Sequence, residues 1–259
     1  MKRTFTFVAC LTWILATGAQ AQNIFSYSSG DSVFYASDTE SHCEADVITP
    51  FGSNPDSEIL GDDDADIEEI ASIGEDIGPY LLVTPITDAS VSITEGVAFA
   101  DAWGADTYTE VEAFLDVIRV FVETGFDGLD TEVEVFTSNP FSPTSASAFA
   151  EMWVDVSTTT EFHLANAQTL DLSADLSNTF LCSVATVTIK IDDATEITLS
   201  LPGGADTDTV PLNLSSGAHT LTVIYSVDSQ IESSFSGVGA DDDSCAAGGV
   251  AVEVVLIDD

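Results

Sequence analysis

The chain has 259 residues, of which 45 are acidic and 4 are basic, so its formal net charge is −41 at pH 7. A surface this negative repels phosphates and anionic lipids, which excludes nucleic acid and anionic membranes as partners and leaves cations, cationic surfaces and neutral glycans. Hydrophobic residues make up 45 % of the chain, enough apolar surface for a folded core, so the charge does not indicate disorder.

The N-terminus has the three parts of a secretory signal. Lys2 and Arg3 supply the positive start, residues 4–17 are uncharged and largely apolar, and Ala19-Gln20-Ala21 is a small-x-small cleavage motif. We predict that residues 1–21 are a signal peptide and that the protein is secreted or periplasmic. No stretch has the length that a membrane helix needs, so no membrane insertion is expected. Removal of the signal leaves 2 basic against 45 acidic residues, a net charge of −43.

Cysteine usage agrees with an oxidising compartment. Cys43, Cys182 and Cys245 follow the signal, and an odd number predicts one disulfide and one remaining thiol. We favour a bond between Cys182 and Cys245, because each comes just before a strand-like run, at residues 184–191 and 250–257. Spacing alone leaves the other pairings open.

Residues 22–79 have the weakest pattern in the mature chain. Short apolar runs at 24–27 and 32–35 could be strands, and residues 49–66 contain the Gly, Pro, Ser and Asp typical of a loop. The spacing of isoleucines indicates at most a short helix within 65–76. We therefore predict a loosely structured, acidic N-terminal extension over residues 22–79.

From Tyr80 onward the chain has the period-two alternation of β-strands. Residues 111–122 could be a helix by periodicity, but their Val, Ile and Phe content and the Gly125-Phe126-Asp127-Gly128 that follows favour strand. In the second half, Asp192-Asp193 reads as the turn of a hairpin, and alternating runs occur at 149–156, 187–191, 197–201, 221–227 and 250–256. Many short strands separated by turns predict one all-β domain over residues 80–259, a two-sheet antiparallel β-sandwich of jelly-roll type.

Part of this region resembles a known group of proteins. The Phe-containing run at 149–156, the Phe162-x-Leu164 strand and the Leu214-x-x-Gly217-x-His219-x-Leu221 stretch are similar to the β-sandwich region of secreted bacterial proteins that often carry a C-terminal Pro-Glu-Pro sorting tail. That group usually has Tyr where this chain has His219, and the tail is not seen here. The resemblance, over residues 149–227, implies a sandwich and export; it implies neither surface anchoring nor a particular activity.

Acidic runs are the candidate metal sites. Asp62, Asp64 and Asp66 match the first three ligand positions of a calcium-binding EF-hand loop. Ile67 stands where that loop needs Gly, however, and Ile73 where it needs Glu. Either these residues bind calcium in another geometry or they are solvated acidic residues, which a composition this acidic produces by itself. The weaker candidates are Asp241, Asp242 and Asp243, and the pair Asp206 and Asp208.

No motif assigns a catalytic residue. His42, His163 and His219 lack zinc-ligand spacing, and there is no nucleophile elbow, phosphate loop or dinucleotide fingerprint. A glycosidase needs only two suitably spaced carboxylates, which so many acids leave open. Trp103 and Trp153 are either core residues or a sugar-stacking platform, with Trp103 the better candidate for exposure.

The sequence therefore predicts a secreted, non-catalytic β-sandwich that acts as a matrix, surface or binding component and is modulated by divalent cations, calcium first among them. One alternative is a carbohydrate-binding module or polysaccharide hydrolase. A second is a self-assembling subunit, in which residues 250–257 would be a donated or edge strand.

Overall fold

The structure is a computed structural model that describes residues 24–27, 31–49, 52–69, 80–93, 98–135 and 145–258. For residues 49, 52–69, 80–93, 99, 101 and 103–106 it describes the backbone alone. The predicted signal peptide lies outside the described residues. In the part of the chain that is described, no helix is long and apolar enough to span a membrane.

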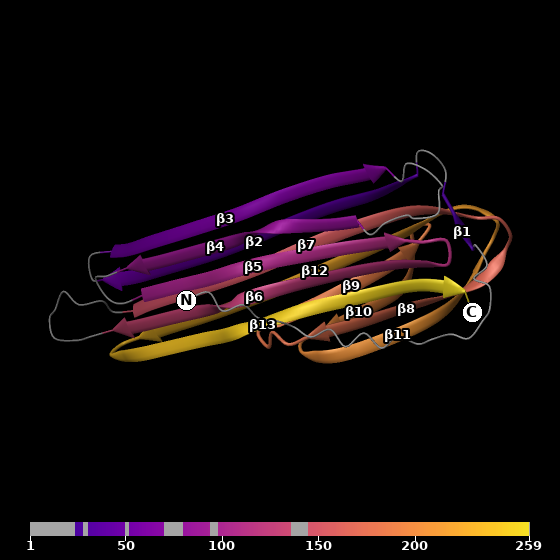
Figure 1. The fold of residues 1–259 in the computed structure, drawn as a ribbon. Coiled ribbons are helices and arrows are strands. Elements are labelled where there is room, and N and C mark those ends of the chain that lie inside the picture. Colours follow the sequence, from indigo (N-terminus) through magenta and orange to yellow (C-terminus); the bar gives the residue numbers. More distant parts are fainter. Residues whose placement is uncertain are drawn as a thin grey trace.

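Among the described residues every element is a β-strand, and all strand pairs are antiparallel (Figure 1). One sheet has the order β10-β9-β12-β7-β2-β3, with β1 also pairing with β7, and the other has the order β11-β8-β13-β6-β5-β4. The predicted all-β, two-sheet sandwich is confirmed. The strands are β1 (Phe25–Ser26), β2 (Ser32–Thr49), β3 (Gly52–Glu69), β4 (Tyr80–Ile93), β5 (Ala98–Ala113), β6 (Val117–Val135), β7 (Ser145–Leu164), β8 (Gln168–Asn178), β9 (Ser183–Ile191), β10 (Ala194–Leu201), β11 (Gly204–Leu214), β12 (Gly217–Ser236) and β13 (Gly239–Asp258).

The two sheets face each other across one core, because most strands alternate between buried and outward residues. In β7, for example, Met152 and Val154 are buried while Trp153 between them faces outward. The chain crosses between the sheets repeatedly, so that β6 lies against β7 and β12 against β13. Strands of 18 to 20 residues are far longer than the usual five or six, and a 20-residue strand extends about 66 Å, which makes the sandwich elongated (Figure 1).

The six-stranded sheet changes its alternation along one transverse line. Phe126 and Leu129 of β6 are both buried although they are an odd number of residues apart, and the same holds for Cys245 and Val250 of β13. On one side of this line the even-numbered residues of β6 face the core, and on the other side the odd-numbered residues do. We call it the crease; it comprises residues 103–106, 127–128 and 246–249, which the strand register aligns.

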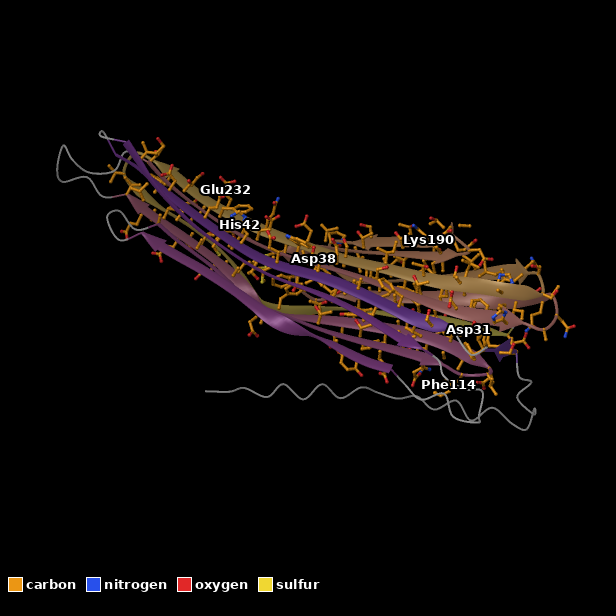
Figure 2. All side chains as sticks on the ribbon, turned by 90° about the horizontal axis from the view of Figure 1, so that it is seen from above. Asp31, Asp38, His42, Phe114, Lys190 and Glu232 are labelled. Carbon is orange, nitrogen blue, oxygen red and sulfur yellow. A yellow bond between two sulfur atoms is a disulfide. The ribbon has the colours of Figure 1, made fainter. Side chains whose placement is uncertain are left out.

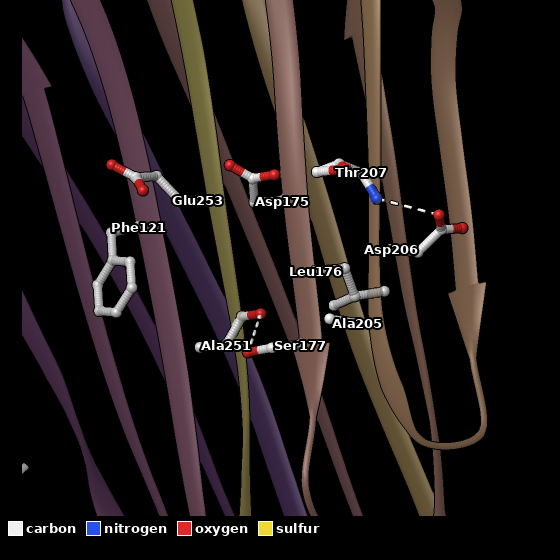
Figure 3. A pocket seen from close by; sticks show the side chains of 9 residues that line it. All are labelled: Phe121, Asp175, Leu176, Ser177, Ala205, Asp206, Thr207, Ala251 and Glu253. Atoms are coloured by element: carbon white, nitrogen blue, oxygen red, sulfur yellow. Dashed lines mark hydrogen bonds between the residues drawn. The ribbon is translucent and has the colours of Figure 1, made fainter. Parts of the chain in front are cut away.

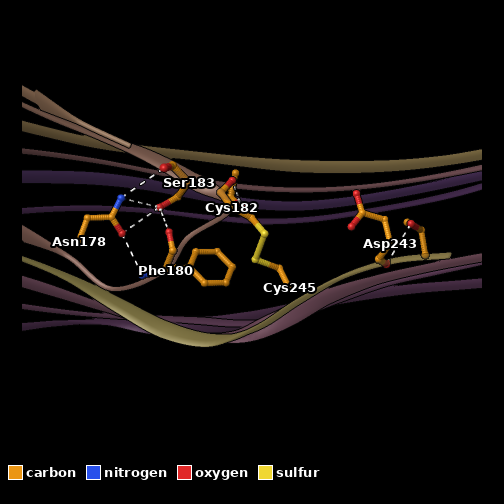
Figure 4. Close-up of a disulfide and its surroundings, with 8 residues drawn as sticks. Asn178, Phe180, Cys182, Ser183, Asp243 and Cys245 are labelled. Atoms are coloured by element: carbon orange, nitrogen blue, oxygen red, sulfur yellow. Dashed lines mark hydrogen bonds between the residues drawn. A yellow bond between two sulfur atoms is a disulfide. The ribbon is translucent and has the colours of Figure 1, made fainter. Parts of the chain in front are cut away.

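The connection between β8 and β9 is fastened to the crease. Phe180 stacks on Phe126 with ring centroids 4.7 Å apart, and Thr179 Oγ1 both donates to the Gly249 carbonyl and accepts from the Gly249 N–H. The predicted disulfide between Cys182 and Cys245 is present next to them (Figure 4). It joins residues 63 positions apart and ties this connection to β13. Cys43, the third cysteine among the described residues, is buried and is not part of a disulfide.

Several local predictions can be compared with these elements. The strand preference over 111–122 is confirmed, with a turn at 114–116 that separates β5 from β6. Asp192 and Asp193 have φ of 49° and 66° and form the predicted hairpin turn between β9 and β10. Residues 250–257 lie between β6 and β8, so the prediction that they form an edge or donated strand is wrong.

The loop predicted over 49–66 is also wrong, because residues 52–69 form β3 and pair with β2 along its whole length. β3 is rich in acidic and turn-forming residues and has no alternation of apolar and polar residues, so its sequence does not predict a strand. Of the short helix predicted within 65–76, residues 65–69 are strand and the rest lies outside the described residues. β2 pairs with β7, so the described part of the predicted extension continues the seven-stranded sheet. The domain division at residue 80 stays a prediction.

Candidate functional site

The outer face of the six-stranded sheet has a hollow of about 350 Å³, which we call the sheet hollow (Figure 3). It crosses β6, β13, β8 and β11 on the side of the crease that includes the C-terminal half of β13. Its lining combines one aromatic ring, three carboxylates and two hydroxyls with small side chains. The lining residues are Phe121, Asp175, Leu176, Ser177, Ala205, Asp206, Thr207, Ala251 and Glu253.

Cross-strand register explains why the sheet is hollowed at this point. Glu253 pairs with Phe121 on one side and with Asp175 on the other, and Asp175 pairs with Thr207, so these four side chains form one row across the strands. On β13, β8 and β11 the neighbouring row consists of Ala251, Ser177 and Ala205, and Glu123 continues it on β6 outside the hollow. Because Ala251, Ser177 and Ala205 are small, they form the bottom of the hollow, and the larger side chains of the first row form one of its sides.

An aromatic pair stands at one end of the sheet hollow. The rings of Tyr108 and Phe121 meet edge to face with centroids 6.1 Å apart, and the Tyr108 hydroxyl donates to Glu110 Oε2 at 2.9 Å. Burial, that hydrogen bond and the neighbouring carboxylates raise the pKa of Tyr108 to about 12. Tyr108 therefore stays neutral at physiological pH, and its ring packs against the ring of Phe121. Phe121 itself remains partly exposed.

The charge of the sheet hollow is strongly negative. Arg119 donates to Glu112 at 2.9 Å and lies 3.1 Å from Glu253, so it neutralises part of one wall. Within the described residues, no basic side chain forms an ion pair with Asp175 or Asp206. The site can thus offer carboxylate oxygens as acceptors beside an apolar ring, an arrangement suited to a ligand with many hydroxyl donors.

The structure places the predicted metal ligands on strands. Asp62, Asp64 and Asp66 belong to β3, where their backbone pairs with β2 and their side chains are not described. Asp241, Asp242 and Asp243 are exposed on β13. Neighbouring residues of a strand face opposite ways, so these three do not converge.

Asp241 instead accepts a hydrogen bond from the Ser234 N–H, and Asp206 and Asp208 each accept one from the residue that follows. Within the described residues, no group of three or more metal-ligating side chains gathers in one place. The side chains of β3 are not among the described ones, so calcium binding stays a prediction.

The histidines serve separate local roles. His42 and Glu44 lie on the outer face of β2, 3.2 Å apart, while Cys43 between them is buried, so the triplet does not form a common site. His163 lies 3.2 Å from Asp31 and joins the N-terminal residues to β7.

His219 is buried and bonded at both ring nitrogens. Its Nδ1 lies 2.6 Å from an Asp192 carboxylate oxygen, its Nε2 lies 2.8 Å from the Ser215 carbonyl, and its ring packs against Phe162. A bond back to a carbonyl four residues upstream is the role of Tyr in a tyrosine corner, so His219 takes over that function here. Burial acts to lower the pKa of His219, but the bonds to Asp192 and Ser215 and the Asp192 charge outweigh it and raise the pKa.

A second group of acidic and aromatic residues lies on the outer face of the seven-stranded sheet. Trp153 is half-buried there, so it is not a core residue, and it pairs with Glu40 and Asp228 on the adjacent strands. The side chain of Trp103 is not described. Glu232, His42, Asp38 and Lys190 spread along the length of the molecule on its upper side (Figure 2).

Sequence reasoning missed the main residues of the sheet hollow. Phe121, Asp175 and Glu253 come from three strands that are far apart in the chain, and nothing local marks them as neighbours. The one available signal was an aromatic at an outward position of an alternating strand, where a charged or small residue is more usual. Asp206, named above only as a possible cation ligand, does line the sheet hollow.

No protein-family model and no curated protein matches the chain. Among solved structures it is similar to a GH31 alpha-xylosidase from Xanthomonas citri, with 8 % identity and a TM-score of 0.23 over 68 % of this chain and 34 % of that chain. It is also similar to an isomalto-dextranase from Arthrobacter globiformis T6 complexed with panose, with 11 % identity and a TM-score of 0.22 over 88 % of this chain and 30 % of that chain. The chain spans about a third of the length of each protein, and at these TM-scores neither activity carries over to it.

Proposed function

We propose that the protein is a non-catalytic, extracellular or periplasmic binding component that holds a neutral glycan in the sheet hollow. The observation that carries the proposal is the row of Phe121, Glu253, Asp175 and Thr207 beside a floor of small side chains. The disulfide between Cys182 and Cys245 supports an oxidising compartment, where extracellular glycans occur.

The chemistry of the sheet hollow suits a sugar better than other ligand classes. An exposed aromatic ring packs against the apolar face of a pyranose, and carboxylates accept hydrogen bonds from its hydroxyls. The lining is too polar for a purely apolar ligand, and its negative charge repels acidic polysaccharides. Because the row crosses four strands that are about 4.8 Å apart, it favours an elongated ligand that lies across the strands.

The two carboxyl groups with a raised pKa lie away from the sheet hollow and are not spaced as a glycosidase pair. Within the described residues, Glu151 and Asp155 have a raised pKa, chiefly because they are partly buried and secondarily because Asp228 is close. Both lie on β7, in the sheet opposite the sheet hollow, and four residues of strand separate them by roughly 13 Å. Glycosidases place their two carboxyl groups about 5–9.5 Å apart, so this pair does not suit that reaction.

The proposal is tested by measuring the affinity of the mature protein for a panel of neutral polysaccharides, with an acidic polysaccharide for comparison. We expect Phe121→Ala to weaken binding about tenfold or more, because it removes the ring against which the sugar packs. Phe149→Ala is the matched control, since Phe149 is a partly buried aromatic on the outer face of the opposite sheet. Equal loss in both variants, or no binding to any neutral glycan, would overturn the proposal.

A further inference from the structure

Trp153, on the outer face of the seven-stranded sheet, has a carboxylate on each of its four sides. Glu40 of β2 and Asp228 of β12 pair with it directly, so their Cβ atoms lie about 5 Å from its own. Glu151 and Asp155 lie two residues before and after it on β7, about 6.7 Å away on the same face. We call these five residues the Trp153 frame. Trp153 is half-buried, so part of its ring system is open to solvent.

No lysine or arginine neutralises the carboxylates of the Trp153 frame. Arg119 and Lys190 are the basic residues of the described chain, and neither forms an ion pair with the frame. Arg119 is engaged by two glutamates of the other sheet. The ion pair that the frame does have is with a histidine, since His42 Nδ1 lies 3.9 Å from Glu151. The sheet hollow thus has a cation of its own beside it, whereas the Trp153 frame lacks one.

This arrangement of carboxylates is unfavourable for the isolated protein. Like charges at directly opposite and diagonal positions of neighbouring strands repel each other, and Asp228 is diagonal to both Glu151 and Asp155. Partial burial is the main reason why the pKa of each of these two carboxyls is raised, and the charge of Asp228 raises both further. A positively charged partner seated on the frame would remove this repulsion.

The geometry favours an organic cation over a metal ion. A metal needs several ligands around one point, and within the described residues no group of three or more metal-ligating side chains is that close together. In the frame the carboxylates are held apart by an indole ring, which attracts a cation to its face. A guanidinium group has both a flat face that stacks on such a ring and N–H donors for carboxylates on either side.

We propose that the Trp153 frame binds an arginine side chain in an extended, basic segment of a partner protein. Alternate side chains of an extended segment lie about 6.7 Å apart, which is also the repeat of Glu151, Trp153 and Asp155 along β7. An arginine stacked on Trp153 would therefore have its neighbouring basic residues above the flanking carboxylates. The net charge of −41 attracts such a segment from a distance and speeds its association.

The Trp153 frame is independent of the sheet hollow. Glu40 lies on β2 between Asp38 and His42, which are labelled in Figure 2, and the sheet hollow is on the outer face of the other sheet. The two ligands also differ, because the hollow is proposed to take a neutral glycan. Failure of glycan binding would leave this proposal untouched, and the reverse holds as well.

The test is calorimetric titration of the mature protein with a synthetic peptide in which arginine alternates with serine, beside a peptide of equal length with lysine in place of arginine. We expect the lysine peptide to bind several-fold more weakly, since a compact, strongly hydrated ammonium stacks less well on a ring. Trp153→Ala should weaken binding of the arginine peptide about tenfold or more. Glu40→Gln should weaken it several-fold. Glu132→Gln is the matched control, because Glu132 is exposed on the outer face of the opposite sheet, and it should keep the affinity.

Asp228→Asn gives a second readout, in which stability and binding change in opposite directions. At low ionic strength the free variant should unfold at a higher temperature than the wild type, because repulsion within the frame is reduced, while its affinity for the arginine peptide falls. The proposal is overturned if Trp153→Ala leaves the affinity unchanged. It is also overturned if Glu132→Gln weakens binding as much as Glu40→Gln, since the total charge of the protein would then account for the attraction.

Discussion

His219 shows how a single residue couples the fold to pH. The Ser215 carbonyl and the Asp192 carboxylate are both acceptors, so His219 can satisfy both only when each ring nitrogen carries a proton. The Asp192 carboxylate also accepts from the Thr220 N–H at 2.9 Å, which ties the β9–β10 turn to the start of β12. The charged form of His219 is therefore the form that the native corner stabilises.

This geometry predicts a loss of stability as the pH rises. A group whose pKa is raised by folding stabilises the folded state fully below its unfolded pKa, about 6.5 for His, and that contribution disappears as pH passes the higher folded pKa. Thermal unfolding across this range should show a fall of about 2–4 °C, equivalent to about 1 kcal/mol. His219→Tyr should lack that fall, because a tyrosine corner does not titrate there. Parallel profiles for the two proteins would contradict the assignment.

At the scale of elements, the crease determines how the β8–β9 connection seats on the six-stranded sheet. Gly248 is the residue that permits this contact, because a Cβ at that position would lie 2.7 Å from the Phe180 Cα, a backbone atom that no side-chain rotation can move. The stacked rings of Phe126 and Phe180 and the disulfide hold the same connection from either side.

We expect Gly248→Ala to lower the free energy of unfolding by about 1–3 kcal/mol, the usual cost of forcing extra volume into a packed site. Gly249→Ala is the matched control, since its Cβ would meet only the Thr124 carbonyl oxygen at 3.3 Å, and its effect should be smaller. Chemical denaturation with the disulfide intact measures both. If the Gly249 variant were the less stable of the two, the close approach of Phe180 would not be the constraint described.

At the scale of the whole molecule, charge and shape act together. A net charge of −41 is spread over an elongated sandwich whose two outer faces both carry carboxylates. Within the described residues only Arg119 and Lys190 are basic, so self-repulsion opposes folding along the full length of the strands.

We therefore predict that sodium chloride raises the unfolding midpoint by several degrees between about 10 mM and 1 M, as the Debye length falls from about 30 Å to 3 Å. Choline chloride should act almost equally, because screening depends on ionic strength and not on the identity of the cation. A midpoint that does not change with salt would mean that the surface charges contribute little to stability.

Much of the fold could be predicted from local pattern. The sequence shows the alternation in β7 and β12 and the strand character of residues 117–122, because successive side chains of a strand face opposite sides. It also shows the turn at Asp192-Asp193. β3 could not be predicted, since its acids match loop composition and only its pairing with β2 makes it a strand. The sheet hollow could not be predicted either, because Phe121, Asp175 and Glu253 meet through register.

By itself, then, the sequence determined the all-β class and the hairpin turn at Asp192, which are properties of short segments and composition; it favoured the Cys182–Cys245 pair but left the other pairings open. Only the tertiary structure decided which strands are neighbours, that residues 250–257 lie inside a sheet, and which outward side chains share a row. The physical reason is that strand pairing is long-range. Backbone hydrogen bonds between strands carry no residue identity, so the burial of the whole core selects the register, and the register creates the candidate sites.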